Sequence, residues 1–250
     1  MRATILGSGS CVPSLKRGSS GILIEAAGKK ILVDVGLGTL HKLLQLGITY
    51  SDIDILCCTH FHPDHTCELA PFLFACKYAE EKRKKDLLII GGEGFTSFFS
   101  SLSGIYQGWL SPEIFQLEVR ELAGSSYSSG GVDITAAHVK HSPESVAFRF
   151  SEGGKSVVFS GDTGYCPEIV KFARGSDLLI LECSSPNIFE TDAHLNPASA
   201  GKIAVEAGCK KLLLTHFYPI CGQYDIASEC AEIFKGELVL AEDLMVVEVG

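Results

Sequence analysis

The sequence predicts a protein of the α/β (α+β) class in which two β-sheets lie between outer layers of helices. Short runs with strand character recur from one end of the chain to the other, and several alternate with segments of helical periodicity. Each half contains both kinds of segment, so each half can form a sheet covered by helices. No stretch has the composition of a linker, and we therefore expect residues 1–250 to form one domain.

The N-terminal half is expected to begin with a strand and a hairpin. Two apolar runs flank a turn at Gly28, which is typical of a hairpin, and a later helix is expected to end at Gly47. The expected strands are 1–7, 22–26, 30–33, 53–58 and 87–90, and the expected helices are 37–46, 66–83 and 95–109. The last helix carries a stripe of aromatic and aliphatic residues, which predicts a core-facing side; a substrate lid or a dimer face is the alternative.

The C-terminal half has strand-like runs first and alternating helices and strands afterwards. The expected strands are 114–122, 132–137, 145–150, 156–159, 178–181, 211–214, 238–240 and 244–249, and the expected helices are 167–173, 197–207 and 225–234. This half too therefore mixes strands and helices, as expected for a sheet covered by helices.

Composition indicates a soluble globular protein, with 46% hydrophobic and 20% charged residues. No run approaches the roughly 18 apolar residues of a membrane span, and the first residues do not resemble a signal peptide. The ten cysteines include no CxxC pair, and several lie in apolar runs, so we expect reduced thiols in a cytoplasmic protein.

The formal net charge of −9 argues against a broad basic groove for nucleic acid. One basic run, 82–85, follows two glutamates at the end of the expected helix 66–83. Basic residues are favourable at a helix C-terminus, so this run is interpreted as a solvated helix end.

The strongest chemical signal is the segment 59–65, Thr-His-Phe-His-Pro-Asp-His, directly after an expected buried strand. Imidazoles crowded on one turn repel each other when protonated and gain little unless a metal binds. In an extended segment His60 and His62 can converge on one ion, while Asp64 and His65, past the bend, can serve a second. The segment therefore predicts a metal site.

The HxHxDH pattern resembles the signature of the metallo-β-lactamase superfamily. Further motifs of that superfamily occur in order at Asp34 (ILVDVG), His141 (HVKHSP), Asp162 (FSGDT) and His216 (LLTHF), so the resemblance covers nearly the whole chain. It implies the four-layer αβ/βα sandwich of the superfamily and a hydrolase with two Zn²⁺ ions, Mn²⁺ or iron being the alternatives.

The resemblance also implies which residues bind the metal ions. Each ion would have three side chains of its own, and one carboxylate would bind both ions. They are His60, His62 and His141 for one ion, Asp64, His65 and His216 for the other, and Asp162 as the bridge. His138 competes with His141, which is favoured because the strand 145–150 then lies at the usual offset of the family. Asp34 would orient a ligand or its loop, the alternative being a turn cap.

Residue 62 bears on the reaction class. Members that reduce oxygen at a di-iron site tend to have a glutamate there, whereas His62 suits zinc or manganese and hydrolysis. Two ions about 3.5–4 Å apart can lower the pKa of a bridging water to near neutrality, which makes it a nucleophile. Asp64 is counted among the expected catalytic residues, together with Glu182 and His194.

Within the superfamily, the chain most resembles the ribonuclease Z and cyclic phosphodiesterase branch. Glu182 (LLILECS) lies where that branch carries the glutamate of a His-Glu-Ala-Thr motif, although Leu181 and Cys183 depart from the motif. His194 (AHLNP) lies where the branch has a histidine. The resemblance implies that this histidine pairs with the glutamate and protonates the leaving oxygen, a role worth about 10²–10⁴-fold. A helix-entry residue is the alternative for His194.

The substrate is expected to be a small or cyclic phosphodiester. Ribonuclease Z carries a long tRNA-gripping arm between the equivalents of His141 and Asp162, whereas here 142–161 suffices only for two strands and a turn. The alternatives are a lactone or thioester hydrolase on the same metal centre, a ribonuclease Z-like tRNA 3′ endonuclease, or a non-enzymatic protein that keeps the fold. A homodimer through the helix 95–109 is implied by the resemblance alone.

Overall fold

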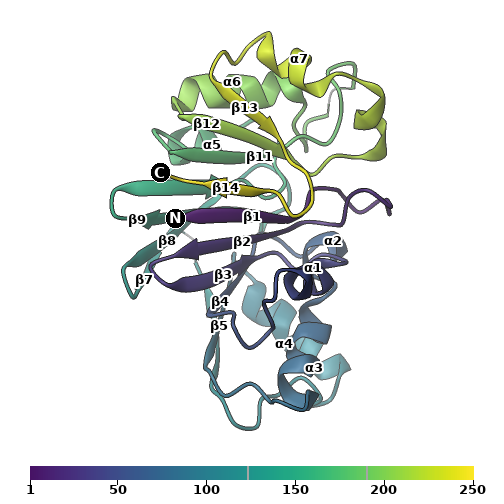
Figure 1. Cartoon of the computed structure of the whole chain (residues 1–250), viewed down its shortest axis with the longest axis vertical. Coiled ribbons are helices and arrows are strands. Elements are labelled where there is room, and N and C mark those ends of the chain that lie inside the picture. Colours follow the sequence, from purple (N-terminus) through teal and green to yellow (C-terminus); the bar gives the residue numbers. More distant parts are fainter. Residues whose placement is uncertain (123, 190) are drawn as a thin grey trace.

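The computed structural model describes residues 1–122, 124–189 and 191–250 and shows four layers, with helices outside and two sheets inside (Figure 1). The strand order is β14-β1-β2-β3-β4-β5-β6 in the first sheet and β13-β12-β11-β10-β9-β8-β7 in the second. The helices α1 to α4 accompany the first sheet, and α5 to α7 lie beside the second. The predicted four-layer αβ/βα sandwich is therefore confirmed.

The elements are short and evenly spread. The strands of the first sheet are β1 (Arg2–Gly7), β2 (Gly21–Ala26), β3 (Lys29–Val33), β4 (Ile55–Cys58), β5 (Leu87–Gly91), β6 (Leu117–Glu121) and β14 (Val246–Glu248). Those of the second are β7 (Ser126–Ser129), β8 (Val132–His138), β9 (Val146–Glu152), β10 (Lys155–Phe159), β11 (Leu178–Glu182), β12 (Lys211–Thr215) and β13 (Glu237–Leu240). The helices are α1 (Thr39–Gln45), α2 (Pro63–Thr66), α3 (Leu69–Tyr78), α4 (Phe95–Ile105), α5 (Pro167–Phe172), α6 (Pro197–Ala207), α7 (Ile226–Ala231) and the 3₁₀ helix η1 (Pro219–Gln223).

Side chains on the two faces of the first sheet pack into two separate cores. In β2, Ile22 and Ile24 face the second sheet, while Leu23 between them packs in the cluster that contains the buried side of α3. Successive side chains of a strand point to opposite faces, so a strand apolar at every position is buried on both. The sandwich follows directly from these continuous apolar runs.

The carboxyl ends of parallel strands carry the polar segments of interest. In the first sheet β3 pairs in parallel with β4, and Asp34 and the segment 59–65 follow these two strands. In the second sheet β10, β11 and β12 are parallel neighbours, followed or ended by Asp162, Glu182 and His216. Loops after parallel strands gather at one edge of a sheet, where ligands usually bind.

The prediction of one long helix over residues 66–83 is wrong. The expected helix 66–83 is instead α2 and α3, and α3 ends at Tyr78, so the basic run 82–85 does not lie at a helix end. Arg83 in that run is 0% exposed. Its guanidinium donates hydrogen bonds of 2.6–2.7 Å to four backbone carbonyls, those of Tyr50, Ile53, Lys85 and Asp86. The prediction of a solvated run is wrong for this residue.

The aromatic stripe of residues 95–109 faces the core as far as Leu102. Phe95 is fully buried, and Phe98, Phe99 and Leu102 are partly buried and pack against the core. Beyond them α4 ends at Ile105, and Ile105 and Trp109 are 74% and 55% exposed. A lid or a dimer face at the exposed end stays a prediction.

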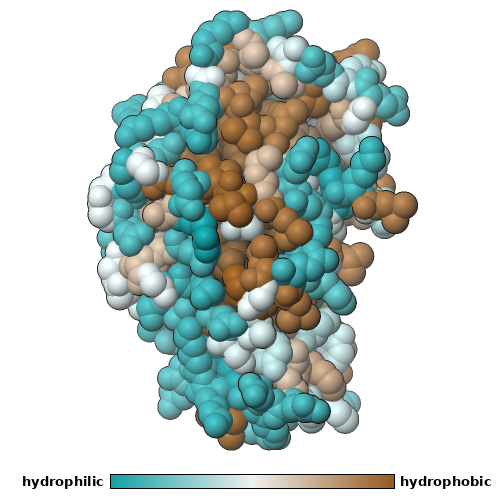
Figure 2. Space-filling view, in the orientation of Figure 1, coloured by the Kyte–Doolittle hydropathy of each residue, from teal (hydrophilic) through white to brown (hydrophobic). Residues whose placement is uncertain are grey.

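Hydrophobic residues also gather in a band over the middle of the face seen in Figure 2, which includes the region of the edge strands β13 and β14. Val246 of β14 is half exposed there. Within the described residues, no helix combines the length and the apolar character that crossing a membrane requires.

Replacing Arg83 should strongly destabilise the fold. Arg83→Met removes the donors of four carbonyls, and because each buried polar group left without a partner costs about 1–3 kcal/mol, we expect a loss of at least about 3 kcal/mol. Urea unfolding would measure it, with Lys84→Met, at an exposed neighbour, as the control. Equal stability of the two variants would show that water satisfies the carbonyls.

Candidate metal centre

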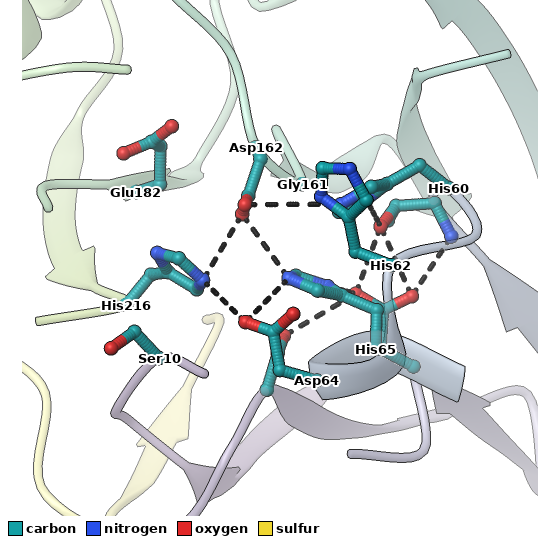
Figure 3. Close-up of polar contacts among 12 residues, drawn as sticks. Ser10, His60, His62, Asp64, His65, Gly161, Asp162, Glu182 and His216 are labelled. Atoms are coloured by element: carbon teal, nitrogen blue, oxygen red, sulfur yellow. Dashed lines mark hydrogen bonds and ion pairs between the residues drawn. The ribbon is translucent and has the colours of Figure 1, made fainter. Parts of the chain in front are cut away.

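The side chains implied as ligands come together in the structure, and all of them except His141 are labelled in Figure 3. Atoms of His60, His62, His141 and Asp162 lie within 4.8 Å of one another, and atoms of Asp64, His65 and His216 form a second such group. The two groups combine residues from both halves of the chain. His141 Nε2 lies 3.2 Å from His62 Nδ1, and His216 Nε2 lies 3.3 Å from Asp64 Oδ2.

Asp162 faces both groups with different oxygens. Its Oδ2 lies 3.8 Å from His60 Nε2 and 4.0 Å from His141 Nε2. Its Oδ1 lies 3.3 Å from His65 Nε2 and 3.4 Å from His216 Nε2. One carboxylate therefore faces both sets of imidazoles, with a different oxygen toward each.

The imidazole nitrogens meet a further requirement of a metal site, which is a free lone pair. His60, His65 and His141 point Nε2 toward the centre and hydrogen-bond through Nδ1, whereas His62 turns Nδ1 toward His141. His65 Nδ1 bonds Asp34 Oδ2 at 2.7 Å, and His141 Nδ1 bonds the carbonyl of Ala193 at 3.0 Å. His60 Nδ1 bonds Thr59 Oγ1 at 3.1 Å. A hydrogen bond at one ring nitrogen selects the tautomer whose other nitrogen can bind a metal.

Buried polar atoms without partners point to the same conclusion. Nε2 of His60 and of His65 are buried and have no hydrogen-bond partner among the described residues. A buried polar atom without a partner is costly, and a cation would satisfy both. Burial, reinforced by the charge of His65, also lowers the pKa of His60, so its ring is neutral and able to coordinate. The residues present therefore fit a metal centre.

Asp34 organises the loop behind the imidazoles. Its Oδ1 accepts a hydrogen bond of 2.8 Å from the backbone N–H of Thr59, and Oδ2 accepts from His65 and from Ser20. Asp34 thus contacts His65 of one candidate group directly and reaches His60 of the other through Thr59. These contacts suit a residue that orients ligands. The motif does not single out Thr59 as a functional residue, yet its hydroxyl links Asp34 to His60.

The loops at the centre contain strained backbone. Asp34 (φ 58°) and His216 (φ 60°) adopt the left-handed conformation that non-glycine residues rarely use. At Gly36, a Cβ would lie 2.1 Å from the carbonyl oxygen of Asp64, so only glycine permits this approach of the two loops. Strain and tight packing of this kind hold the side chains in place before any ligand arrives.

Glu182 and His194 form the predicted pair. Glu182 is fully buried, and its Oε1 accepts the proton of His194 Nδ1 at 2.7 Å and the backbone N–H of Thr163 at 2.9 Å. Burial disfavours the protonated imidazole, but the hydrogen bond and charge of Glu182 outweigh it and raise the pKa of His194. Leu181, where the motif has histidine, is buried in the core and takes no part.

The structure also distinguishes His138 from His141 and shows what the interval 142–161 forms. His138 ends β8 with an exposed side chain and belongs to neither candidate group, whereas His141 does. Residues 142–161 consist mainly of the β9–β10 hairpin, so no arm projects from this interval.

Comparisons with known proteins agree with this geometry. The family described as Anti-Pycsar protein Apyc1 matches residues 1–229. The chain belongs to this family. An uncharacterized protein of Mycobacterium tuberculosis, Rv1339, is 31% identical and matches 94% of this chain and 88% of its own length.

Two further relatives are hydrolases by name. The probable metallo-hydrolase YhfI of Bacillus subtilis is 28% identical over 99% of this chain and all of its own. The crystal structure of YhfI, a metallo-β-lactamase fold protein, matches 99% of both chains with a TM-score of 0.84 and 26% identity. Ribonuclease Z of Mycobacterium marinum is 28% identical over 98% of each chain. The chain is therefore a metal-dependent hydrolase of the metallo-β-lactamase fold, in its ribonuclease Z-like branch.

Replacing Asp34 should weaken metal binding without removing a ligand. In Asp34→Asn an amide N–H₂ would face groups that all donate, so His65 and Thr59 lose their orientation, and losing such support typically costs about 10–100-fold in metal affinity. Competition with a chelator would measure the change. Asp177→Asn is the control, because Asp177 accepts a backbone bond from Ser156 outside the candidate groups. Equal affinities would contradict the role given to Asp34.

Proposed function

We propose that this hydrolase is a dinuclear phosphodiesterase that cleaves a small or cyclic phosphodiester. The observation that carries the proposal is the contact between Glu182 and His194 at the rim of the candidate metal centre. Oxygen or nitrogen atoms of Asp162, His194 and His216 lie within 4.8 Å of one another. A proton donor at this place suits a reaction that must release an alkoxide, which is a poor leaving group.

The two ions would be held by the ligands implied from the sequence. They are His60, His62 and His141 for one ion, Asp64, His65 and His216 for the other, and Asp162 between them. Nitrogen and carboxylate donors suit zinc first, with manganese or iron as alternatives. When bound, such ions supply Lewis acidity toward a phosphoryl oxygen and acidify a coordinated water.

The protein's own groups would move the protons. Asp64 bonds His216 through Oδ2, so its other oxygen is available to accept a proton from the attacking water. His194 is fixed through Nδ1 by Glu182, so its Nε2 can donate a proton to the leaving oxygen. Glu182 would act through His194 by holding its orientation and stabilising its charge.

A small substrate is supported by what borders the centre. The β9–β10 hairpin leaves no room in the chain for a tRNA-binding arm, and the net charge of −9 disfavours a polyanion as long as tRNA. The ribonuclease Z relative keeps a tRNA 3′ endonuclease as the second candidate. Ten free cysteines, most of them buried, fit a reducing compartment such as the cytoplasm.

A panel of substrates tests the proposal. We expect the zinc- or manganese-loaded enzyme to hydrolyse bis-p-nitrophenyl phosphate, and Asp162→Ala to lose at least one ion per chain and all turnover, because its carboxylate faces both groups. Metal analysis and initial rates measure the two effects. A lactone and a thioester belong in the same panel. Cleavage of these without phosphodiester turnover would reject the phosphodiesterase.

The proton donor has a separate test. His194→Ala should keep both ions but slow the cleavage of alkyl phosphodiesters by about 10²–10⁴-fold, and that of p-nitrophenyl esters much less, because only the poor leaving group needs a proton. The ratio of the two rates in wild type and variant measures the effect. Undiminished cleavage of an alkyl phosphodiester would remove His194 from the mechanism.

A further inference from the structure

A cavity of about 780 Å³ adjoins the candidate metal centre on the side of His194. It is lined by the loop after β8, the segment after β10, the stretch that leads into α6, α6 itself, and Ile233 beyond α7. Its lining includes Lys140, Tyr165, Asp192, His194, Ser199 and Lys202. A volume of this order accommodates a group as large as a nucleotide.

The cavity lies where a leaving group would go. The ring of His194 lines the cavity, and it lies 4.8 Å from the ring of the candidate ligand His141. A displaced oxygen departs on the side opposite the attacking water, and in the proposed reaction it departs toward His194. The group attached to that oxygen therefore occupies this cavity.

The charges of the cavity favour an anion. The chain has a net charge of −9, yet two lysines and His194 line this cavity. Asp192 is the acidic residue in the lining. Lys140 Nζ lies 3.2 Å from Asp192 Oδ1, but the Asp192 side chain is fully exposed, and such surface pairs contribute little. An entering anion can take the place of Asp192.

Lys202 is held over the cavity by its neighbours. Its Nζ lies 4.3 Å from the centre of the Tyr165 ring and 4.0 Å from Glu206 Oε1. The other oxygen of Glu206 accepts the Tyr165 hydroxyl proton at 2.6 Å, so this carboxylate is shared. An ammonium group has three donors, and these contacts leave Lys202 able to bind a further acceptor.

We propose that this cavity is a subsite for a second anionic group, a phosphate or a carboxylate, carried by the leaving half of the substrate. The inference rests on the proposed phosphodiesterase function and narrows its substrate class. The preferred substrate is a phosphodiester whose leaving half bears its own negative charge. Lys140 and Lys202 determine this specificity, and the metal centre does not.

Two matched substrates test the subsite. The methyl phosphodiesters of 4-hydroxybenzoate and of 4-hydroxybenzamide have leaving groups of nearly the same size that differ by one negative charge. The measured quantity is the kcat/KM of the carboxylate divided by that of the amide. A ratio taken within one preparation does not depend on the fraction of folded enzyme.

Each variant of a charged cavity residue is expected to change this ratio in a stated direction. The double variant Lys140→Gln, Lys202→Gln should lower the ratio about tenfold, which corresponds to about 1.4 kcal/mol. Lys202→Arg should keep most of the preference, and Asp192→Asn should increase the preference because it frees Lys140. Lys171→Gln, which removes one positive charge from α5 outside the cavity lining, should leave the ratio at its wild-type value.

The measurements distinguish a failure of the proposed subsite from a failure of the proposed phosphodiesterase function. A wild-type ratio in the double variant overturns the subsite and leaves the phosphodiesterase standing. A ratio that falls equally in Lys171→Gln also overturns it, because the effect is then one of overall charge. If neither phosphodiester is cleaved while a lactone or a thioester is, the proposed function itself fails.

Discussion

The arrangement of the whole molecule depends on the charge of Asp162. The carboxylate is almost completely buried between the two sheets, and burial alone would raise its pKa. The facing His216 and His65 outweigh burial and hold the pKa well below the usual range. A buried anion persists only where partners surround it, so the loops of both sheets must keep a fixed relation. Each half of the sandwich supplies partners that the other half needs.

The order of the strands brings these loops together. Parallel strands in each sheet end at the same edge, so residues distant in the chain reach one place without long loops. Asp34 then ties the imidazoles to the backbone of the first sheet, and Glu182 does the same for His194 in the second. The centre is preorganised by buried carboxylates that accept hydrogen bonds, one from each sheet.

The sequence predicts what is encoded locally and misses what depends on distant contacts. Continuous apolar runs predict the strands, and the spacing within 59–65 predicts which side chains converge; their role as metal ligands stays a prediction. Arg83 is misjudged because three of its neighbours in the basic run are solvated, while its carbonyl partners include Tyr50 and Ile53 in another loop. The cavity beside His194 is hidden for the same reason, because its lysines lie far apart in the chain.

The pairing of β14 with β1 has a consequence for how the chain acquires its structure. Arg2 lies opposite Glu248, so β1 gains its outer neighbour from a strand far along the chain. Such a distant contact forms late, because a large loop must close first. During synthesis, this edge of β1 therefore stays open until β14 has been made, and it is exposed to pairing with other nascent chains.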